Sequence, residues 1–381
     1  MLVRSSLELN LPHSSMRDLW IHDDDLIVAT HGRSFWILDD ITPLRQISEA
    51  MEKSTAFLFK PGAAYRVMRD TNTDTPIPPD EPTAQNPPDG AIVDYFLAQS
   101  AEGAVRIEIL DAQSKVVRRY SSTDKPQLSE EDLAKQLIPP YWVLKHKALA
   151  ATAGMHRWVW DLHYATPVST RYDYPIAAVP RDTPRLPLGP SALSGQYTVR
   201  LTVDGHTFTE PLTVKMDPRV KTPQEGLVQM FQLQSKLAEM MTESSQALLE
   251  GRPVHEQLQK LAGQANGPVA DAISAFDKKL SALLGGGGFF APPSPKPTLG
   301  RVNGDASALY GELGRADATP TTAQMSATAE TEKALREVSK QWKELKSVDL
   351  PALNKQLHSA SLPEIRLEPE QPEQDDSDDI D

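Results

Sequence analysis

The residue types best suited to chemistry occur in short groups that are dispersed along the 381-residue chain. Asp23-Asp24-Asp25 could bind calcium, but this run lacks the spaced ligands and the glutamate of an EF-hand loop and is typical of a turn. His255-Glu256 begins like a zinc-protease motif, yet residue 259 is glutamine, so the second histidine is missing. The sequence therefore predicts no metal site.

Acidic pairs and glycine runs do not form a recognisable reaction centre either. Asp39-Asp40 and Glu130-Glu131 are sequence neighbours on expected turns, whereas a glycosidase needs two carboxylates about 5 to 9.5 Å apart across a cleft. The glycines at 285–288 have neither a preceding strand nor a following Lys-Ser/Thr, so they indicate a linker rather than a phosphate loop. The chain has no cysteine, no G-x-S-x-G and no Walker motif. We therefore expect no catalytic residues and no cofactor in this chain.

Two tryptophans are the only candidates for ligand contact. Trp158 and Trp160 are separated by one residue in the run 154–162, so both lie on one face of a predicted strand. Aromatic side chains on one face can stack against sugar rings, and the same pattern also typifies the core of a sandwich. Both interpretations stay open at the level of sequence.

The strand with these tryptophans belongs to a set of short alternating strands. The run 105–110 is apolar on one face and charged on the other, as in a half-buried antiparallel strand. Asp204-Gly205 lies between two β-rich runs and predicts a tight hairpin, because both turn residues tolerate positive φ. Six or seven such strands predict an immunoglobulin-like antiparallel β-sandwich over 91–217, with a long loop insertion over 163–195.

The first 45 residues predict a separate, smaller unit. Three short strands end near residues 22, 30 and 38, and His31-Gly32-Arg33 places a glycine where a turn needs positive φ. A three-stranded antiparallel meander is the unit from which β-propeller blades are built. One meander cannot bury both of its faces, so we expect 1–45 to be an orphan blade that needs neighbours, followed by a connector over 46–90.

The most distinctive part of this unit is Leu26-Ile27-Val28-Ala29-Thr30-His31-Gly32-Arg33-Ser34-Phe35-Trp36-Ile37-Leu38-Asp39-Asp40. It resembles the closing blade of large bacterial sortilin-like propellers, also called BNR-repeat or "glycosyl hydrolase" propeller proteins. The chain from residue 1 to about 360 is similar to the region that follows the propeller in this family, and the strand at 158–161 is its other distinctive part. The resemblance implies a secreted or periplasmic protein. It also implies that any glycosyl hydrolase-like catalytic residues lie outside this chain.

After residue 217 the apolar period changes from 2 to 3.6 residues. The predicted helices run from Thr222 as N-cap, with Pro223 at N1, to about Gly251 and then over 254–261, 268–284 and 321–348. They predict a small antiparallel bundle over 218–360. A further short helix is predicted from Ser129 as N-cap with Asp132 at N3. The acidic run at the end of the chain predicts a disordered tail over 361–381.

The expected fold is thus an α+β multidomain chain with an orphan blade, a sandwich, a bundle and a tail. Its net charge of −13 argues against nucleic acid and anionic membranes as partners, and no run approaches the roughly 20 apolar residues of a membrane span. The start, Met1-Leu2-Val3-Arg4, lacks the apolar region of a signal peptide. An extracytoplasmic location therefore follows from the resemblance, and a cytoplasmic one would follow if Met1 is the native start.

Two functional hypotheses follow. The first is a non-catalytic structural or interaction region that supports or docks on a propeller, which is supplied upstream or by a separate chain. Binding of a protein ligand through the bundle is compatible with it. The alternative is a carbohydrate-active protein, either a glycoside hydrolase through the propeller or a sugar-binding protein through the sandwich.

Overall fold

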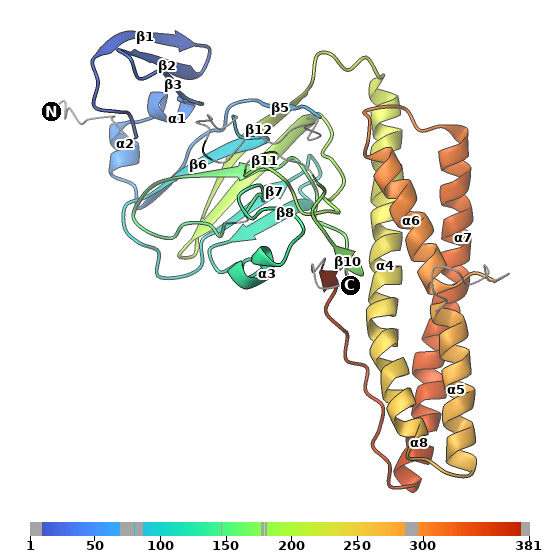
Figure 1. Ribbon diagram of the computed structural model, residues 1–381. Helices are drawn as coiled ribbons and strands as arrows, with labels where there is room; N and C mark the ends of the chain where they lie inside the picture. Colours follow the sequence, from blue (N-terminus) through green and yellow to red (C-terminus); the bar gives the residue numbers. More distant parts are fainter. Residues whose placement is uncertain are drawn as a thin grey trace.

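The computed structural model describes residues 10–68, 80, 87–145, 147–176, 179, 181–285 and 296–374. The glycine run after Gly285, most of the expected proline-rich loop after residue 70 and the acidic end after residue 374 lie outside these residues. The described chain is a mixture of sheets and helices (Figure 1). A small sheet at the N-terminal end, two larger sheets packed on each other and a group of long helices follow in chain order.

Eight strands form the two larger sheets. One sheet has the order β4-β6-β9, and the other has the order β5-β12-β11-β7-β8. Their bounds are β4 (Ala56–Leu58), β5 (Ala64–Arg66), β6 (Ala91–Leu97), β7 (Arg106–Leu110), β8 (Val116–Ser121), β9 (Gly154–Trp160), β11 (Gly195–Val203) and β12 (His206–Met216). One hydrophobic cluster contains buried residues of both sheets, including Val93 and Leu201, so the sheets pack face to face. β4 and β5 come from the expected connector and complete the two sheets.

Local turn chemistry sets the register of the longest hairpin. Val203 pairs with His206 across the turn between β11 and β12. The two turn residues, Asp204 and Gly205, have φ of 47° and 81°, which is the left-handed region that the Asp-Gly pair tolerates. The hairpin predicted from these two residues is therefore confirmed.

A charge cluster links three neighbouring strands on the outside of the five-stranded sheet. Glu108 on β7 accepts hydrogen bonds from Arg200 Nε on β11 at 2.8 Å and from Arg119 Nε on β8 at 2.9 Å. Partial burial alone would raise the pKa of Glu108, but the hydrogen bonds from Arg200 and Arg119 outweigh it and hold the pKa below its usual value. The carboxylate therefore stabilises the folded sheet in its charged form.

Replacing Glu108 by glutamine (Glu108→Gln) tests this cluster. Because the folded-state pKa is lowered, the stabilisation is complete above the ordinary glutamate pKa of about 4.3 and is lost as the pH falls through the folded-state pKa. We expect the variant to be less stable by about 1–3 kcal/mol at pH 7, and this difference should shrink at pH 3. Urea unfolding at both pH values measures it. Glu102→Gln, at an exposed loop position, is the control, and a difference that does not change with pH would contradict the prediction.

The helical part is longer and more continuous than the sequence predicts. Its elements are α4 (Gln224–Ala262), α5 (Pro268–Leu284), α6 (Leu299–Leu313), α7 (Thr322–Glu344), a π-helical turn η1 (Leu345–Asp349) and α8 (Leu350–Ser359). α5 has the predicted bounds, and α7 begins next to the predicted residue 321, where Thr321 is the N-cap and forms a capping box. The expected N-cap of α4 at Thr222 is wrong by one residue, because Pro223 holds that position.

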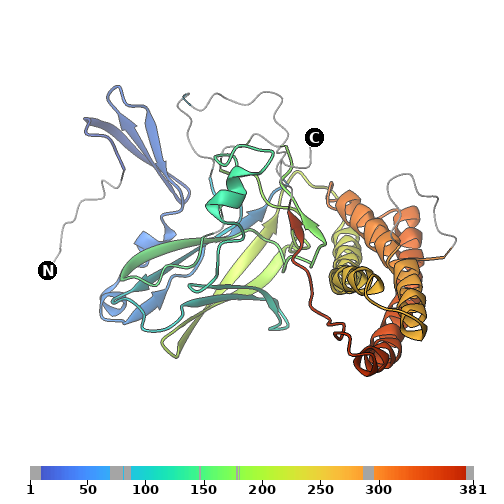
Figure 2. The ribbon, with the colours of Figure 1, turned by 60° about the horizontal axis from the view of Figure 1, so that its bottom comes forward.

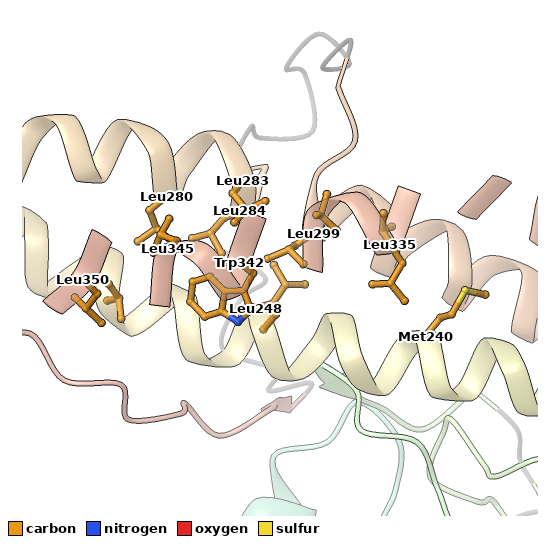
Figure 3. Packing of buried hydrophobic residues seen from close by; sticks show 14 of the residues in the cluster. Met240, Leu248, Leu280, Leu283, Leu284, Leu299, Leu335, Trp342, Leu345 and Leu350 are labelled. Carbon is orange, nitrogen blue, oxygen red and sulfur yellow. The ribbon is translucent and has the colours of Figure 1, made fainter. Parts of the chain in front are cut away.

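α4 continues through the point where the sequence predicted its end. Gly251 is buried there, and a Cβ atom at this residue would lie 2.6 Å from Cδ2 of Leu284, so the glycine allows α5 to approach closely. Trp342 lies beside Leu248 and Leu284 in the shared core (Figure 3). The glycine thus serves helix packing and does not end the helix.

α6 was not predicted at all, and its sequence explains why. It contains three glycines, at 300, 304 and 311, and each lowers helix propensity. The tertiary context decides instead, since Val302, Ala306 and Tyr310 are buried in the bundle core. The expected bundle of three long helices therefore has α6 as a further member (Figure 2).

The sandwich and the bundle meet at a buried ion pair. Arg66 on β5 contacts Asp317, in the loop before α7, and donates from Nη1 to the backbone oxygen of Ala192 at 2.9 Å. Burial raises the pKa of Asp317 more than the neighbouring Arg66 lowers it. Tyr310 of α6 also donates its hydroxyl to the backbone oxygen of Leu188, at 2.7 Å, in the long loop of the sandwich. That loop therefore packs on the helices.

The remaining elements are short. They are β1 (Met16–His22), β2 (Asp25–Thr30), β3 (Phe35–Leu38), α1 (Thr42–Arg45), α2 (Glu49–Glu52), α3 (Glu130–Ala134), β10 (Arg171–Tyr172) and β13 (Glu373–Gln374). Ser129 caps α3 by accepting a hydrogen bond from the N–H of Asp132, as predicted. The described start of the expected acidic tail differs from a solvated chain, because Ile365 is buried in the bundle core.

Candidate functional site

The N-terminal sheet is the part of the described molecule with the most unusual surface. β1, β2 and β3 form one antiparallel sheet with β2 in the centre. Figure 2 shows that this sheet projects away from the two larger sheets. The three-stranded meander predicted from the sequence is therefore present, and its own neighbours in the chain leave much of it uncovered.

Side chains on one face of this sheet are large and apolar. The register pairs Trp20 with Ile27 and Ile27 with Ile37, so these three residues lie across one face, and Phe35 lies on the same face two residues from Ile37. Trp20 is 65% exposed and Phe35 is 75% exposed. We call this surface, formed by Trp20, Ile27, Phe35 and Ile37, the Trp20 face.

The opposite face is apolar as well. Leu19 pairs with Val28 and Val28 with Trp36, while Ile21 pairs with Leu26. Leu19 is 61% exposed and Ile21 is 56% exposed, whereas Val28 in the central strand is 6% exposed and is covered by its own chain. We call this surface, formed by Leu19, Ile21, Leu26, Val28, Trp36 and Leu38, the Leu19 face. Exposed apolar surface of this kind marks interaction sites in soluble proteins.

Tight turns and local hydrogen bonds keep the sheet in shape. Asp23 has φ of 52° in the first turn and Gly32 has φ of 71° in the second. The carboxylates of the Asp23-Asp24-Asp25 run have structural roles: Asp24 contacts Arg45, and Oδ1 of Asp25 accepts the N–H of Asp40 at 2.9 Å. The turn interpretations of both segments are confirmed.

An arginine is one of the attachments of the sheet to the sandwich; Gln46, after α1, is another, because its side chain makes two hydrogen bonds to the backbone of Lys60. Arg157 on β9 donates from Nη1 to the backbone oxygen of Asp39 at 2.6 Å and from Nη2 to that of Asp40 at 2.7 Å, directly after β3. Its Nε also donates to Oδ1 of Asp94 on β6 at 3.0 Å. We call these contacts the Arg157 clamp. No motif or spacing in the sequence indicates this role of Arg157.

The carboxylate in the clamp is deeply buried. The side chain of Asp94 is 3% exposed, and burial raises its pKa despite the hydrogen bonds from Arg157. Removing the guanidinium would leave this group without its counter-ion and would free two backbone carbonyls. The Arg157 clamp therefore contributes directly to the position of the N-terminal sheet.

The tryptophans predicted as possible sugar contacts lie in the sandwich. Trp160 is 0% exposed, packs edge-on against Tyr197 and donates from Nε1 to the backbone oxygen of His163 at 2.9 Å. Trp158 is half-buried and packs against Tyr120. Trp160 therefore has no surface for a sugar ring and belongs to the core, while Trp158 packs against the same cluster from a partly buried position.

The acidic pairs found in the sequence do not meet in a cleft. Oδ1 of Asp40 accepts the N–H of Thr42 at 3.0 Å at the start of α1, and Glu130 forms an ion pair with Lys145 at 2.8 Å. Within the described residues, no group of three or more His, Asp or Glu side chains is arranged to hold a metal ion. His255, from the zinc-protease-like motif, instead binds Asp277 through Nδ1 at 2.6 Å and joins α4 to α5.

One hydroxyl and imidazole pair has the spacing of a nucleophile and its base. Oγ of Ser191 lies 3.3 Å from Nε2 of His163, and Nδ1 of the same ring lies 2.6 Å from the backbone oxygen of Asp161. We interpret the pair as a contact that joins the long loop to the end of β9.

Comparison with known proteins gives no family for this chain: no protein-family model matches it, and no curated protein is similar to it. Among the described helices, none combines the length and the hydrophobicity needed to cross a lipid bilayer. The chemistry of the surfaces above is therefore the basis for any functional proposal.

The variant Arg157→Ala tests the clamp. We expect it to lower the free energy of unfolding by about 3–5 kcal/mol, because it leaves the buried Asp94 unpaired. Arg157→Lys should recover part of this loss, since an ammonium group cannot make the same forked contacts. Urea unfolding measures these differences. The control is Arg301→Ala, whose partner Asp305 is exposed and whose loss should stay below about 1 kcal/mol. An equal effect of the two alanine variants would contradict the role of the clamp.

Proposed function

We propose that this chain is a non-catalytic structural and interaction region whose N-terminal sheet packs between neighbouring sheets of a β-propeller. The observation that carries the proposal is the apolar surface on both the Trp20 face and the Leu19 face. A sheet of three strands is stable when its apolar faces are packed against other elements. This sheet therefore calls for two neighbours, one for each face.

The demand for two neighbours favours a propeller over simpler partners. A second copy of the chain that packs its sheet face to face would cover one face and leave the other in water. In a propeller, by contrast, every blade lies between two other blades. The resemblance of residues 26–40 to the closing blade of sortilin-like BNR-repeat propellers supports the same partner.

The other parts of the chain fit a supporting role. We interpret the two packed sheets as an immunoglobulin-like sandwich that holds the blade through the Arg157 clamp, with the bundle as a further support. The resemblance also supports a location outside the cytoplasm, secreted or periplasmic. A sugar-binding function through the sandwich has less support, because Trp160 is enclosed in the core.

Photo-cross-linking from both faces tests the proposal. A photoreactive amino acid is placed at Trp20 on one face or at Ile21 on the other, in the full chain expressed in its native cells. We expect both positions to cross-link, and to different sheets of one propeller, because each face has its own neighbour. The control position is Thr207, an exposed polar residue at the tip of the sandwich, which should give no such product.

Three results would contradict the proposal. Cross-links from only one face would mean that one neighbour is enough. Cross-links to a second copy of this chain would indicate self-association. Absence of products at both positions, with the protein folded, would mean that the apolar faces stay in water.

A further inference from the structure

The end of the described chain behaves as a bound peptide. Residues 361–374, which we call the C-terminal strap, leave α8 and run beside α4 towards the sandwich, where β13 pairs in parallel with β10 (Figure 1). The strap is extended between its ends, and from Ser361 to Gln371 its only buried residue is Ile365. A solvated tail was expected here, so its ordered path needs an explanation.

Two side-chain amides of the bundle hold the strap by its backbone. Asn354 of α8 donates from Nδ2 to the oxygen of Ile365 at 3.0 Å and accepts the N–H of the same residue at 2.9 Å. Gln257 of α4 makes the same two contacts with Arg366, both at 2.9 Å. Each amide thus satisfies one donor and one acceptor, as a neighbouring strand would. This mode of binding depends on an extended backbone and only weakly on the side chains.

A third contact supplies a hydrogen bond that α4 lacks. Pro253 has no N–H group, so the carbonyl of Leu249 lacks its partner within the helix. The N–H of Glu370 in the strap donates to this carbonyl at 2.9 Å. Pro253 therefore leaves the carbonyl of Leu249 as an acceptor for the strap. This hydrogen bond helps α4 to continue past the residue where the sequence predicted its end.

Few side chains of the strap are buried against the helices. Ile365 is 3% exposed and belongs to the bundle core, while Leu362 is only partly buried. Every ordered residue of the strap loses conformational entropy, and most of them bury no side chain in return. The strap is therefore able to open locally while the helices stay folded.

Basic side chains lie beside the strap. A groove of about 630 Å³ is lined by Lys346, Lys355 and His358 together with Glu364, Ile365 and Leu367 of the strap itself. The ammonium group of Lys346 is paired with Glu250 at 2.6 Å, which leaves Lys355 and His358 as the basic side chains that face an acidic segment. The strap itself has Glu364, Glu368, Glu370 and Glu373 against a single arginine. Basic side chains in the groove attract such a segment over a longer range than the hydrogen bonds do.

We propose that the surface between α4 and α8 is a binding site for an extended acidic peptide with one aliphatic anchor, and that the C-terminal strap is its exchangeable internal occupant. A competing segment of the same chemistry takes the places of Ile365, Arg366 and Glu370. Displacement of the strap also removes the pairing of β13 with β10, which is one connection between the bundle and the sandwich. The site is independent of the N-terminal sheet and of the function proposed for it.

Binding of a synthetic peptide tests the exchange. A fluorescent peptide with the sequence of residues 361–374 is titrated into the full chain and into its Ile365→Asp variant, in which the internal strap has lost its anchor. The bound strap blocks the site in the native chain, so we expect the variant to bind the peptide about tenfold more tightly or better. Gln371→Asp, at an exposed strap position away from the groove, should behave like the native chain. Adding Asn354→Ala to Ile365→Asp should abolish binding. Failure of the Ile365→Asp chain, with unchanged circular dichroism, to bind the peptide would overturn the proposal.

Hydrogen exchange on the unmodified chain gives a second test that does not depend on variants. The amides of Ile365, Arg366 and Glu370 should be protected, yet exchange about 100-fold faster than buried amides of α4, because the strap opens by itself. In Pro253→Ala the new N–H competes for the carbonyl of Leu249, so protection at Glu370 should fall more than at Ile365. Exchange of the strap at the same rate as α4 would make it a fixed part of the bundle. Complete absence of protection would mean that the site is not occupied. Either result overturns the proposal.

Discussion

Residues 16–38 form a sheet whose two faces are both apolar, and water is a poor solvent for both. Burial of apolar surface contributes about 25 cal/mol per Å², and Trp20, Phe35, Leu19 and Ile21 leave most of their surface unburied in this chain. The two larger sheets bury their apolar faces by packing on each other. Val93 of one sheet and Leu201 of the other lie in the shared core. In the small sheet Val28 is covered among the described residues, but these four exposed side chains are not. The function proposed for the sheet depends on a partner that covers them.

Contacts between distant segments connect this sheet to the rest of the described molecule. The Arg157 clamp fixes the chain directly after β3, with Asp94 as the buried counter-charge. The sandwich in turn is joined to the bundle by the pair of Arg66 and Asp317. A series of contacts thus runs from the exposed sheet to the helices, and each of them joins segments that are far apart in the sequence.

The sequence predicted those features that local chemistry decides. The hairpin at Asp204-Gly205, the cap at Ser129 and the helix from Pro268 follow from backbone preferences of a few neighbouring residues, and all three are present. The three short strands and tight turns of the first 45 residues also predicted the meander, which is present. Signals of this kind lie within a few neighbouring residues of the chain.

Features that depend on distant segments could not be predicted in this way. Arg157 contacts Asp40, which is 117 residues away in the sequence, and no local sequence pattern at either residue indicates this contact. Gly251 and Pro253 indicate the end of a helix by their own propensities, yet Leu284 and Glu370 supply the packing and the hydrogen bond that keep α4 continuous. α6 is helical despite three glycines because the bundle core requires its apolar face.

Native-state hydrogen exchange of the isolated full chain tests the central claim most directly. If the N-terminal sheet lacks its neighbours, the amides of Ile27 and Val28 in the central strand β2 should exchange about 100-fold faster than those of Val199 and Leu201 in β11. Both strands are hydrogen-bonded on two sides, so the difference reports on the covering of the faces rather than on the strand pairing. Equal protection in β2 and β11 would show that the sheet is stable by itself and would contradict the need for a partner.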